Sequence, residues 1–227
     1  MKRKILIAIY IILILLTIKL FYNIVANSVL INKYNNGQYS ESQAKLLTYI
    51  NFPQGYVANY NYGNILYKNE EYDKAIEKYE KALKGIVPKD KECDIRINYA
   101  LSICQTVQVN EQDQKSIEEA IKTYESAIDI LTEKGCANKE DNNGHNKKAE
   151  KLKKDIQEEI NRLKKLQNNP KNNNENNKEE ASEKTEETET IETKIQNIKE
   201  NATKEQREGE NMYKNFNKGL TKKGKNW

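Results

Sequence analysis

The stretch that decides the fold runs from Tyr56 to Leu83 and has the sequence YVANYNYGNILYKNEEYDKAIEKYEKAL. Its pattern predicts one helix through about Tyr67, a short polar turn at 68–71, and a second helix after it. Gly63 in the first helix and Ala75 in the second are small, which allows the two helices to pack closely while tyrosine side chains fill the gaps between them. The stretch therefore predicts a helical hairpin.

This hairpin resembles a tetratricopeptide repeat (TPR), a 34-residue helical hairpin that stacks into arrays. The resemblance rests on the small residue of the first helix, Gly63, on the second-helix pattern and on the proline that follows it, namely Tyr72, Ala75, Tyr79, Ala82, Leu83 and Pro88. It implies a stack of hairpins whose first helices form a concave face that binds peptides.

A second, looser unit follows at 95–131, with an apolar helix, a polar turn at 110–114 and a stripe of apolar residues at helical spacing. Its small residues, Ala100 and Ala120, are eight residues further apart than those of the first hairpin. This difference predicts a longer turn or a longer first helix. Residues 26–51 are expected to form a degenerate first unit, which brings the stack to about three units, the minimum for stability.

The amino terminus predicts a membrane anchor. Met1–Lys4 carries three cations, and residues 5–25 are almost entirely apolar and would span about 30 Å as a helix. Lys19 lies near one end, so its side chain can reach the headgroups. The cationic start predicts a single-pass protein of the cell membrane, with the amino terminus in the cytoplasm and the following domain outside. A signal peptide cleaved at residues 26–28 remains the alternative.

The whole chain is thus expected to be all-α. An anchor at 1–25 precedes TPR-like repeats at 26–134, and an amphipathic helix at 144–167 is expected to cap the stack. Residues 168–227 are poor in apolar side chains, so we expect a mostly disordered tail. Within that tail, 191–202 offers one short conditional helix.

The cysteines suggest one disulfide. Cys93 lies at the start of one predicted helix and Cys136 just past the end of the next, and these ends are neighbours in an antiparallel hairpin. An exported domain lies where disulfides persist. Cys104 is expected to be a buried free thiol. A metal site formed by the two cysteines and His145 is the weaker alternative, because the three residues are scattered.

Composition argues against an enzyme. The 227 residues are 32% charged and 37% apolar, with a net charge of +4 and a single histidine. The sequence contains no Ser/His/Asp set, no glycine-rich phosphate loop and no compact metal-ligand motif. We therefore expect no catalytic residue and no cofactor. Nucleic acid is not an expected partner, because the net charge is small and the domain is expected outside the cell.

The TPR resemblance implies which residues face the groove. In the first unit they are Tyr60, Asn61, Asn64 and Tyr67, and in the second the counterpart of Asn64 is Asn98, with further groove positions at Asp94, Ile97 and Leu101. The two asparagine amides are expected to hydrogen-bond the backbone of an extended peptide. A full carboxylate clamp is not expected, since Tyr60 stands where that pattern has a lysine.

The carboxy-terminal tail is a second candidate surface. Tyr213, Phe216 and Trp227 are interleaved with lysines, and aromatic residues are unusual in a polar tail. They could dock onto a partner protein or onto an anionic polymer of the cell envelope.

The layout also resembles bacterial membrane-anchored TPR proteins encoded beside von Willebrand factor A-domain proteins, as in aerotolerance-type operons. That resemblance rests on the segments 62–67, 72–76, 79–83 and 96–101. It implies a non-enzymatic scaffold whose partner is a protein or peptide, for example a membrane protein with a von Willebrand factor A domain. The alternatives are a binder of anionic wall or lipid polymers and, last, an enzyme of another type. The sequence does not predict the oligomeric state.

Overall fold

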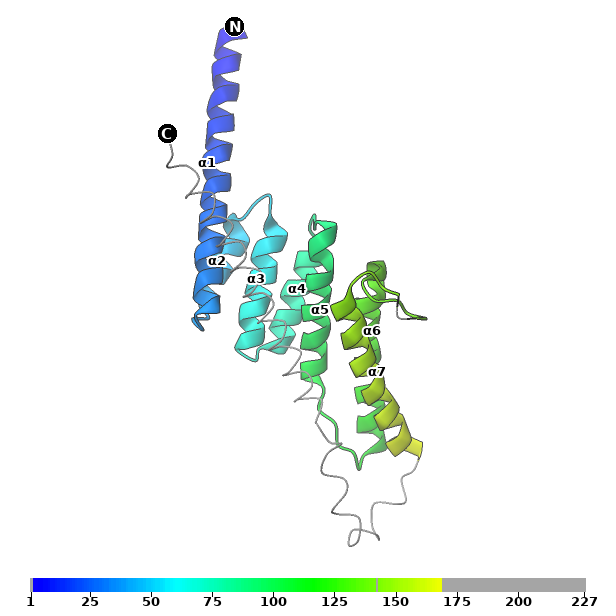
Figure 1. Ribbon diagram of the computed structural model, residues 1–227. Coiled ribbons are helices and arrows are strands. Elements are labelled where there is room, and N and C mark those ends of the chain that lie inside the picture. The colour runs from blue at the N-terminus through cyan, green and yellow to red at the C-terminus, as the bar shows by residue number, and fades with distance from the viewer. Residues whose placement is uncertain (1, 142, 169–227) are drawn as a thin grey trace, which may run out of the picture. The chain divides into compact units, whose positions relative to one another are not determined.

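A computed structural model describes residues 2–141 and 143–168, and every regular element in this part of the chain is a helix (Figure 1). The all-α prediction is therefore confirmed for the described residues. The elements are α1 (Lys2–Asn35), α2 (Glu41–Ile50), α3 (Gly55–Lys68), α4 (Tyr72–Leu83), α5 (Lys89–Thr106), α6 (Gln114–Thr132), the 3-10 turn η1 (Glu133–Gly135) and α7 (Lys147–Asn168).

Helix α1 is long and apolar enough to cross a membrane, judged by length and composition. The sequence suggested a boundary between an anchor and a first repeat at residues 25 and 26, but α1 continues through it without a break. The physical reason is that neither glycine nor proline occurs in the helix. Gly37 closes the turn after it with a φ of 76°. One helix thus carries both the apolar segment and the first arm of the first hairpin.

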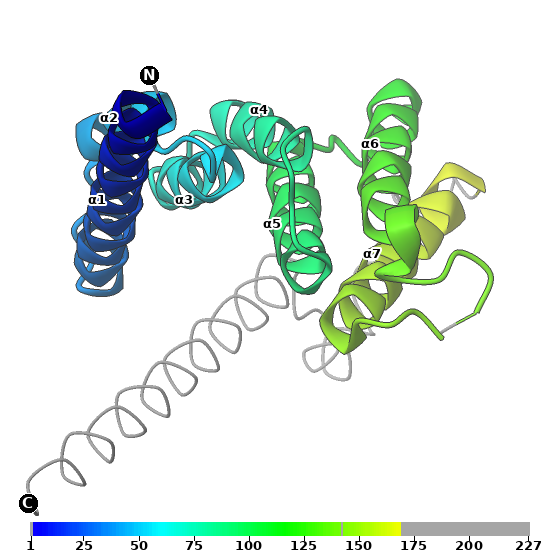
Figure 2. The ribbon, with the colours of Figure 1, turned by 90° about the horizontal axis from the view of Figure 1, so that it is seen from above.

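The later hairpins follow the predicted order. Helices α3 and α4 are joined by a three-residue turn at 69–71, and α5 and α6 by a seven-residue segment at 107–113. Helix α5 has 18 residues against 14 in α3. Of the eight additional residues between Ala100 and Ala120, the turn therefore contributes four, the start of α6 three and the end of α5 one. Successive helices lie side by side from α2 to α6 (Figures 1 and 2).

Small residues set the spacing of the central hairpin, as predicted. A Cβ atom on Gly63 would lie only 2.6 Å from Cε1 of Tyr79, so the α4 tyrosine ring lies directly against the α3 backbone. Tyr79 is 1% exposed, and Ala75 and Ala82 are fully buried. Alternation of small residues with large rings allows the close packing of a protein interior.

Helix α7 covers the region predicted at 144–167 and begins three residues later. Ala149 and Leu152, the first residues of its predicted apolar stripe, are buried. Residues 2–153 belong to one compact unit, which contains α1 to α6 and the start of α7, and the chain from Lys154 onward is assigned to a second. The capping role of α7 stays a prediction. The predicted tail beyond Asn168 and its short helix at 191–202 lie outside the described residues.

Candidate functional site

The candidate site is a group of two asparagines and two tyrosines on three successive helices, which we call the Asn–Tyr cluster. Tyr60 and Asn64 come from α3, Tyr79 from α4 and Asn98 from α5. Nδ2 of Asn98 donates to the Tyr60 hydroxyl at 3.0 Å and to Oδ1 of Asn64 at 2.9 Å. The Tyr79 hydroxyl donates to the same Oδ1 at 2.8 Å. The cluster therefore joins the first helices of two neighbouring hairpins.

Helical spacing explains how the cluster assembles. Tyr60 and Asn64 are four residues apart, so they lie on one side of α3. Asn98 follows Asn64 by 34 residues, and α5 begins 34 residues after α3. The two asparagines thus occupy equivalent positions in successive hairpins. Gly63 completes the arrangement, because the missing side chain lets Tyr79 reach Asn64 from α4.

The cluster is neutral at physiological pH. The pKa of Tyr60 is raised to about 12, mainly by burial and also by the Asp94 carboxylate, while hydrogen bonds with Asn64 and Asn98 oppose the shift. Burial also raises the pKa of Tyr79 well above its usual value. The phenols therefore stay protonated and act as hydrogen-bonding groups, without the ionised form that base catalysis would need.

The cluster is only partly shielded from solvent. Tyr79 is buried, whereas Tyr60, Asn64 and Asn98 are half-buried. Because Asn98 uses its amide nitrogen for both internal bonds, its side-chain oxygen takes no part in them. An asparagine oxygen can accept from a backbone N–H. Chemically, the cluster can offer neutral hydrogen-bonding groups and a tyrosine ring to an extended chain.

The other predicted groove residues lie elsewhere. Asn61 is 9% exposed and donates to Oδ1 of Asn27 at 3.2 Å. Tyr67 is 7% exposed, and its ring packs edge-on against Tyr72 with the ring centres 5.4 Å apart. Asp94 is half-buried, and Ile97 and Leu101 are buried. The tail residues Tyr213, Phe216 and Trp227 lie outside the described residues. Of the predicted set, the structure groups Tyr60, Asn64 and Asn98.

Sequence reasoning missed a second set of asparagines, which we call the buried Asn network. Nδ2 of Asn27 donates to the backbone oxygen of Asn23 at 2.8 Å and to Oδ1 of Asn51 at 2.7 Å. Asn61 donates to Asn27 as described above, and Asn23 donates to the backbone oxygen of Phe52 at 3.1 Å. The four asparagines are between 0% and 9% exposed. The available signal was the 34-residue separation of Asn27 and Asn61, which repeats that of Asn64 and Asn98.

A disulfide joins Cys93 of α5 to Cys136, the pairing that the sequence favoured, with the Cα atoms 5.5 Å apart. Both cysteines are buried. The bond ties the start of α5 to the segment that follows α6. Cys104 is a buried free cysteine, as the sequence analysis expected, and burial raises the pKa of its thiol to about 12.

His145 lies beside this disulfide, with Nε2 at 3.1 Å from Sγ of Cys93. The ligand atoms of Cys93, Cys136 and His145 all lie within 4.8 Å of one another. The scattered residues of the alternative metal site are therefore brought together. Zinc needs thiolate sulfurs, however, and in the disulfide form neither cysteine offers one. In this form the cluster is a disulfide with an adjacent imidazole.

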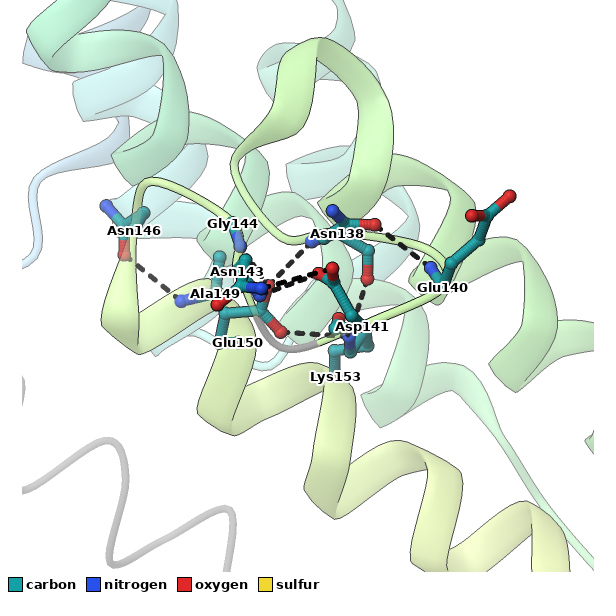
Figure 3. Close-up of polar contacts among 9 residues, drawn as sticks. All are labelled: Asn138, Glu140, Asp141, Asn143, Gly144, Asn146, Ala149, Glu150 and Lys153. Carbon is teal, nitrogen blue, oxygen red and sulfur yellow. Dashed lines mark hydrogen bonds and ion pairs between the residues drawn. The ribbon is translucent and has the colours of Figure 1, made fainter.

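The segment before α7 forms a loop around a lysine (Figure 3). Nζ of Lys153 donates to the backbone oxygens of Asn138 and Asp141 at 2.5 and 2.6 Å and lies 2.9 Å from the Glu150 carboxylate. Glu150 in turn accepts from the backbone N–H groups of Asn138 and Gly144. Burial alone would raise the pKa of Glu150, but these hydrogen bonds and the ammonium hold it below its usual value.

Oxygen groups of this kind are typical ligands of calcium. Here the cation at their centre is the ammonium of Lys153, so the loop already contains a positive charge of its own (Figure 3). The loop is also closely packed, since a Cβ atom on Gly144 would lie 2.5 Å from Cα of Ala137. We therefore assign the loop a structural role.

The polar groups of the Asn–Tyr cluster are both organised and partly open to solvent. Its chemistry is that of hydrogen bonding between neutral groups. No family model matches this chain, and no curated protein or solved structure shows significant similarity to it.

Proposed function

We infer that this chain is a membrane-anchored, non-enzymatic scaffold of the TPR type, which binds an extended segment of a partner protein across the first helices of its hairpins. The observation that carries the proposal is the Asn–Tyr cluster. It joins α3 and α5 through asparagines 34 residues apart, and this separation equals the length of a TPR unit. Backbone N–H and C=O groups of an extended peptide are natural partners for such half-buried amides.

The membrane anchor is supported by α1. The large apolar side chains of α1 from Ile5 to Tyr22 are each 37–69% exposed, so no other part of the compact unit covers them. A stretch of this length and polarity suits a bilayer. The cationic residues Lys2–Lys4 favour a cytoplasmic amino terminus and an outward-facing domain. The disulfide agrees with that orientation, because disulfides persist in oxidising compartments.

Retention of the anchor is supported by the buried Asn network. Cleavage at the small-x-small sequence of residues 26–28 would remove Asn23 and Asn27, which are buried and bonded to residues of the following domain. It would leave Oδ1 of Asn51 and Nδ2 of Asn61 without these partners. A buried polar group that loses its partner costs about 1–3 kcal/mol. The uncleaved helix is therefore the favoured form.

A binding role, rather than catalysis, is supported by the state of the reactive side chains. The single histidine of the chain lies against the disulfide sulfur, and burial keeps the Cys104 thiol protonated. The resemblance to membrane-anchored TPR proteins of aerotolerance-type operons suggests the class of partner. We propose a membrane protein, for example one with a von Willebrand factor A domain.

The experiment is crosslinking of the full-length protein in its native membrane, followed by mass spectrometry. The test variant combines Asn64→Ala with Asn98→Ala. Asn59→Ala is the matched control, since Asn59 is also a half-buried asparagine of α3 and its side chain bonds only back to Gly55 of its own helix. We expect a partner protein that the control retains and the double variant loses.

Two other outcomes would overturn the proposal. If the double variant retains the partner, the cluster is not the binding surface. If the intact protein captures no protein, the scaffold itself is rejected in favour of the envelope-polymer alternative. Binding of an anionic polymer by a lysine-rich tail would weaken steeply with salt, whereas binding between neutral amides would not.

A further inference from the structure

Five large apolar side chains outside α1 remain exposed in the described part of the chain. They are Tyr39, Leu46, Tyr49, Phe52 and Ile86. The two most exposed residues that lie in turns are Phe52, at 73%, and Ile86, at 93%. Phe52 lies in the turn between α2 and α3, and Ile86 in the turn between α4 and α5. Exposed apolar side chains in two turns do not contribute to the core of the protein.

The α2–α3 turn lies directly against α1. The backbone oxygen of Phe52 accepts from Nδ2 of Asn23 at 3.1 Å, and Nζ of Lys19 lies 5.7 Å from the centre of the Phe52 ring. The apolar segment of α1, residues 5–25, is about 30 Å long at 1.5 Å per residue. The hydrocarbon core of a bilayer is about 30 Å thick. Phe52 therefore lies beside the last turns of the apolar segment, close to the level where hydrocarbon meets headgroups.

The α4–α5 turn lies at the same end of the unit. A Cβ atom on Gly85 would lie 3.4 Å from Cβ of Tyr56, so this turn packs against the start of α3, next to the α2–α3 turn. Figure 1 shows both turns on the side from which the amino end of α1 projects, and Figure 2 is viewed from that side. The turns that carry Phe52 and Ile86 thus form a shared edge, made by alternate turns of the stack.

The sequence around Phe52 is unusual for this chain. No charged residue occurs between Lys45 and Lys68, although 32% of all residues are charged. This segment also carries Tyr49, which is 75% exposed on α2. Aromatic side chains are enriched where membranes meet water, and a lysine there extends its ammonium to the headgroups. Lys19 beside the Phe52 ring has this arrangement.

We propose that the edge formed by Phe52 and Ile86, which we call the turn edge, inserts into the boundary between headgroups and acyl chains of the membrane that α1 crosses. The bilayer is the occupant because the turn edge is continuous with α1 through Asn23 and Lys19. This inference rests on the proposed anchor. It adds that the hairpin unit lies on the membrane surface, held at two further points, instead of extending away from it on α1 alone.

The test uses tryptophan fluorescence of the full-length protein in phosphatidylcholine and phosphatidylglycerol vesicles. Trp227 is the only native tryptophan, so the substitution Trp227→Phe removes all native tryptophan fluorescence. Single reporters are then introduced as Phe52→Trp and Ile86→Trp, both at exposed positions where folding is not at stake. Leu13→Trp reports on the α1 segment. Tyr39→Trp is the control, because the α1–α2 turn lies at the opposite end of the hairpins.

Lipids brominated near the headgroup or deep in the acyl chain act as the quenchers. We expect the Phe52→Trp and Ile86→Trp reporters to emit at shorter wavelength and to lose most of their fluorescence to shallow bromines. The Leu13→Trp reporter should be quenched mainly by deep bromines, and the Tyr39→Trp reporter by neither. This set of results would establish the turn edge as a membrane contact.

The quenching results distinguish failure of the turn-edge inference from failure of the proposed anchor. Quenching at position 13 without quenching at 52 and 86 would overturn the turn-edge inference and leave the anchor intact. Absence of quenching at 13 would reject the anchor and, with it, the inference. A blue-shifted but unquenched reporter at 52 or 86 would mean that protein covers the edge, either a second copy or a partner, and would also overturn the inference.

Discussion

Two pairs of asparagines in this protein share one sequence separation and one kind of bond, yet their surroundings differ. Asn27 and Asn61 join α1 to α3, and Asn64 and Asn98 join α3 to α5. In each pair the later asparagine donates its amide nitrogen to the earlier one's oxygen across 34 residues. The first pair is at most 9% exposed, whereas the second is half-buried.

This difference in exposure indicates that burial, and not the hydrogen bond itself, distinguishes the two asparagine pairs. The asparagines of the buried Asn network are at most 9% exposed, so each lost bond leaves a buried polar atom without its partner. In the Asn–Tyr cluster, water can replace a lost partner. We therefore expect the first pair to govern stability and the second to govern binding.

The largest expected effect is that of Asn27→Ala. The substitution removes the donor to Asn51 and the acceptor of Asn61, and it leaves both as buried polar atoms without those bonds. We expect the free energy of unfolding to fall by about 3 kcal/mol. Urea unfolding in detergent, followed by circular dichroism, measures it, with Asn59→Ala as the control. A loss as small as that of the control would mean that the network does not stabilise the fold.

The next effect tests the packing that supports the cluster. In Gly63→Ala the new methyl group would lie 2.6 Å from Cε1 of Tyr79, which must move and lose its bond to Asn64. Overpacking costs about 1–3 kcal/mol, partly offset by the better helix propensity of alanine. The same unfolding assay measures the loss. Gly55→Ala is the matched control, because a Cβ atom there meets nothing within 4 Å and should not destabilise the protein.

A smaller change in stability is expected for Asn98→Ala. Its partners, Tyr60 and Asn64, are half-buried and can hydrogen-bond to water, so the free energy of unfolding should fall by about 1 kcal/mol or less. Asn61→Ala, the equivalent change within the buried network, should cost clearly more in the same assay. If the two substitutions cost the same, exposure does not separate the two pairs and the comparison fails.

The substitution Tyr60→Phe is expected to have the smallest effect on stability at neutral pH. Its effect is specific to the Asn–Tyr cluster and becomes visible at alkaline pH. The pKa of Tyr60 is about 12 in the folded protein and about 10 in an unfolded chain. The unfolded state loses the proton first, so stability present below pH 10 declines as the pH rises from 10 to 12. Tyr60→Phe should lessen this decline, measured as urea midpoints across that range, while Tyr49→Phe, at a 75% exposed position, should not. An unchanged decline in Tyr60→Phe would contradict the assigned pKa.

Much of the fold follows from local patterns. The apolar run at the amino terminus, the spacing of Ala75, Tyr79 and Ala82, and the turn residues of 68–71 predict the long first helix and the central hairpin. The eight additional residues of the next hairpin were also visible as a changed spacing. Such features are determined within one or two helical turns, because periodicity and turn residues act over that distance.

The candidate site was only partly predictable. The TPR resemblance implied Tyr60, Asn61, Asn64 and Tyr67 as groove positions of α3, but it could not tell which of them another helix would cover. Asn61 is bonded to α1, and Tyr67 packs on Tyr72, so neither joins the Asn–Tyr cluster. The same limit explains why the network around Asn27 was missed, since its members come from α1, α3 and the turn between α2 and α3.

The amino-acid sequence by itself establishes that this protein is built from helical hairpins behind a long apolar helix, since periodicity is a property of neighbouring residues. The tertiary structure alone decided that α1 continues into the first hairpin, that Asn64 and Asn98 bond to one another, and that Lys153 lies inside the loop before α7. These outcomes depend on which surfaces meet and which polar atoms lose their water. That information lies in contacts between distant segments, and no local pattern carries it.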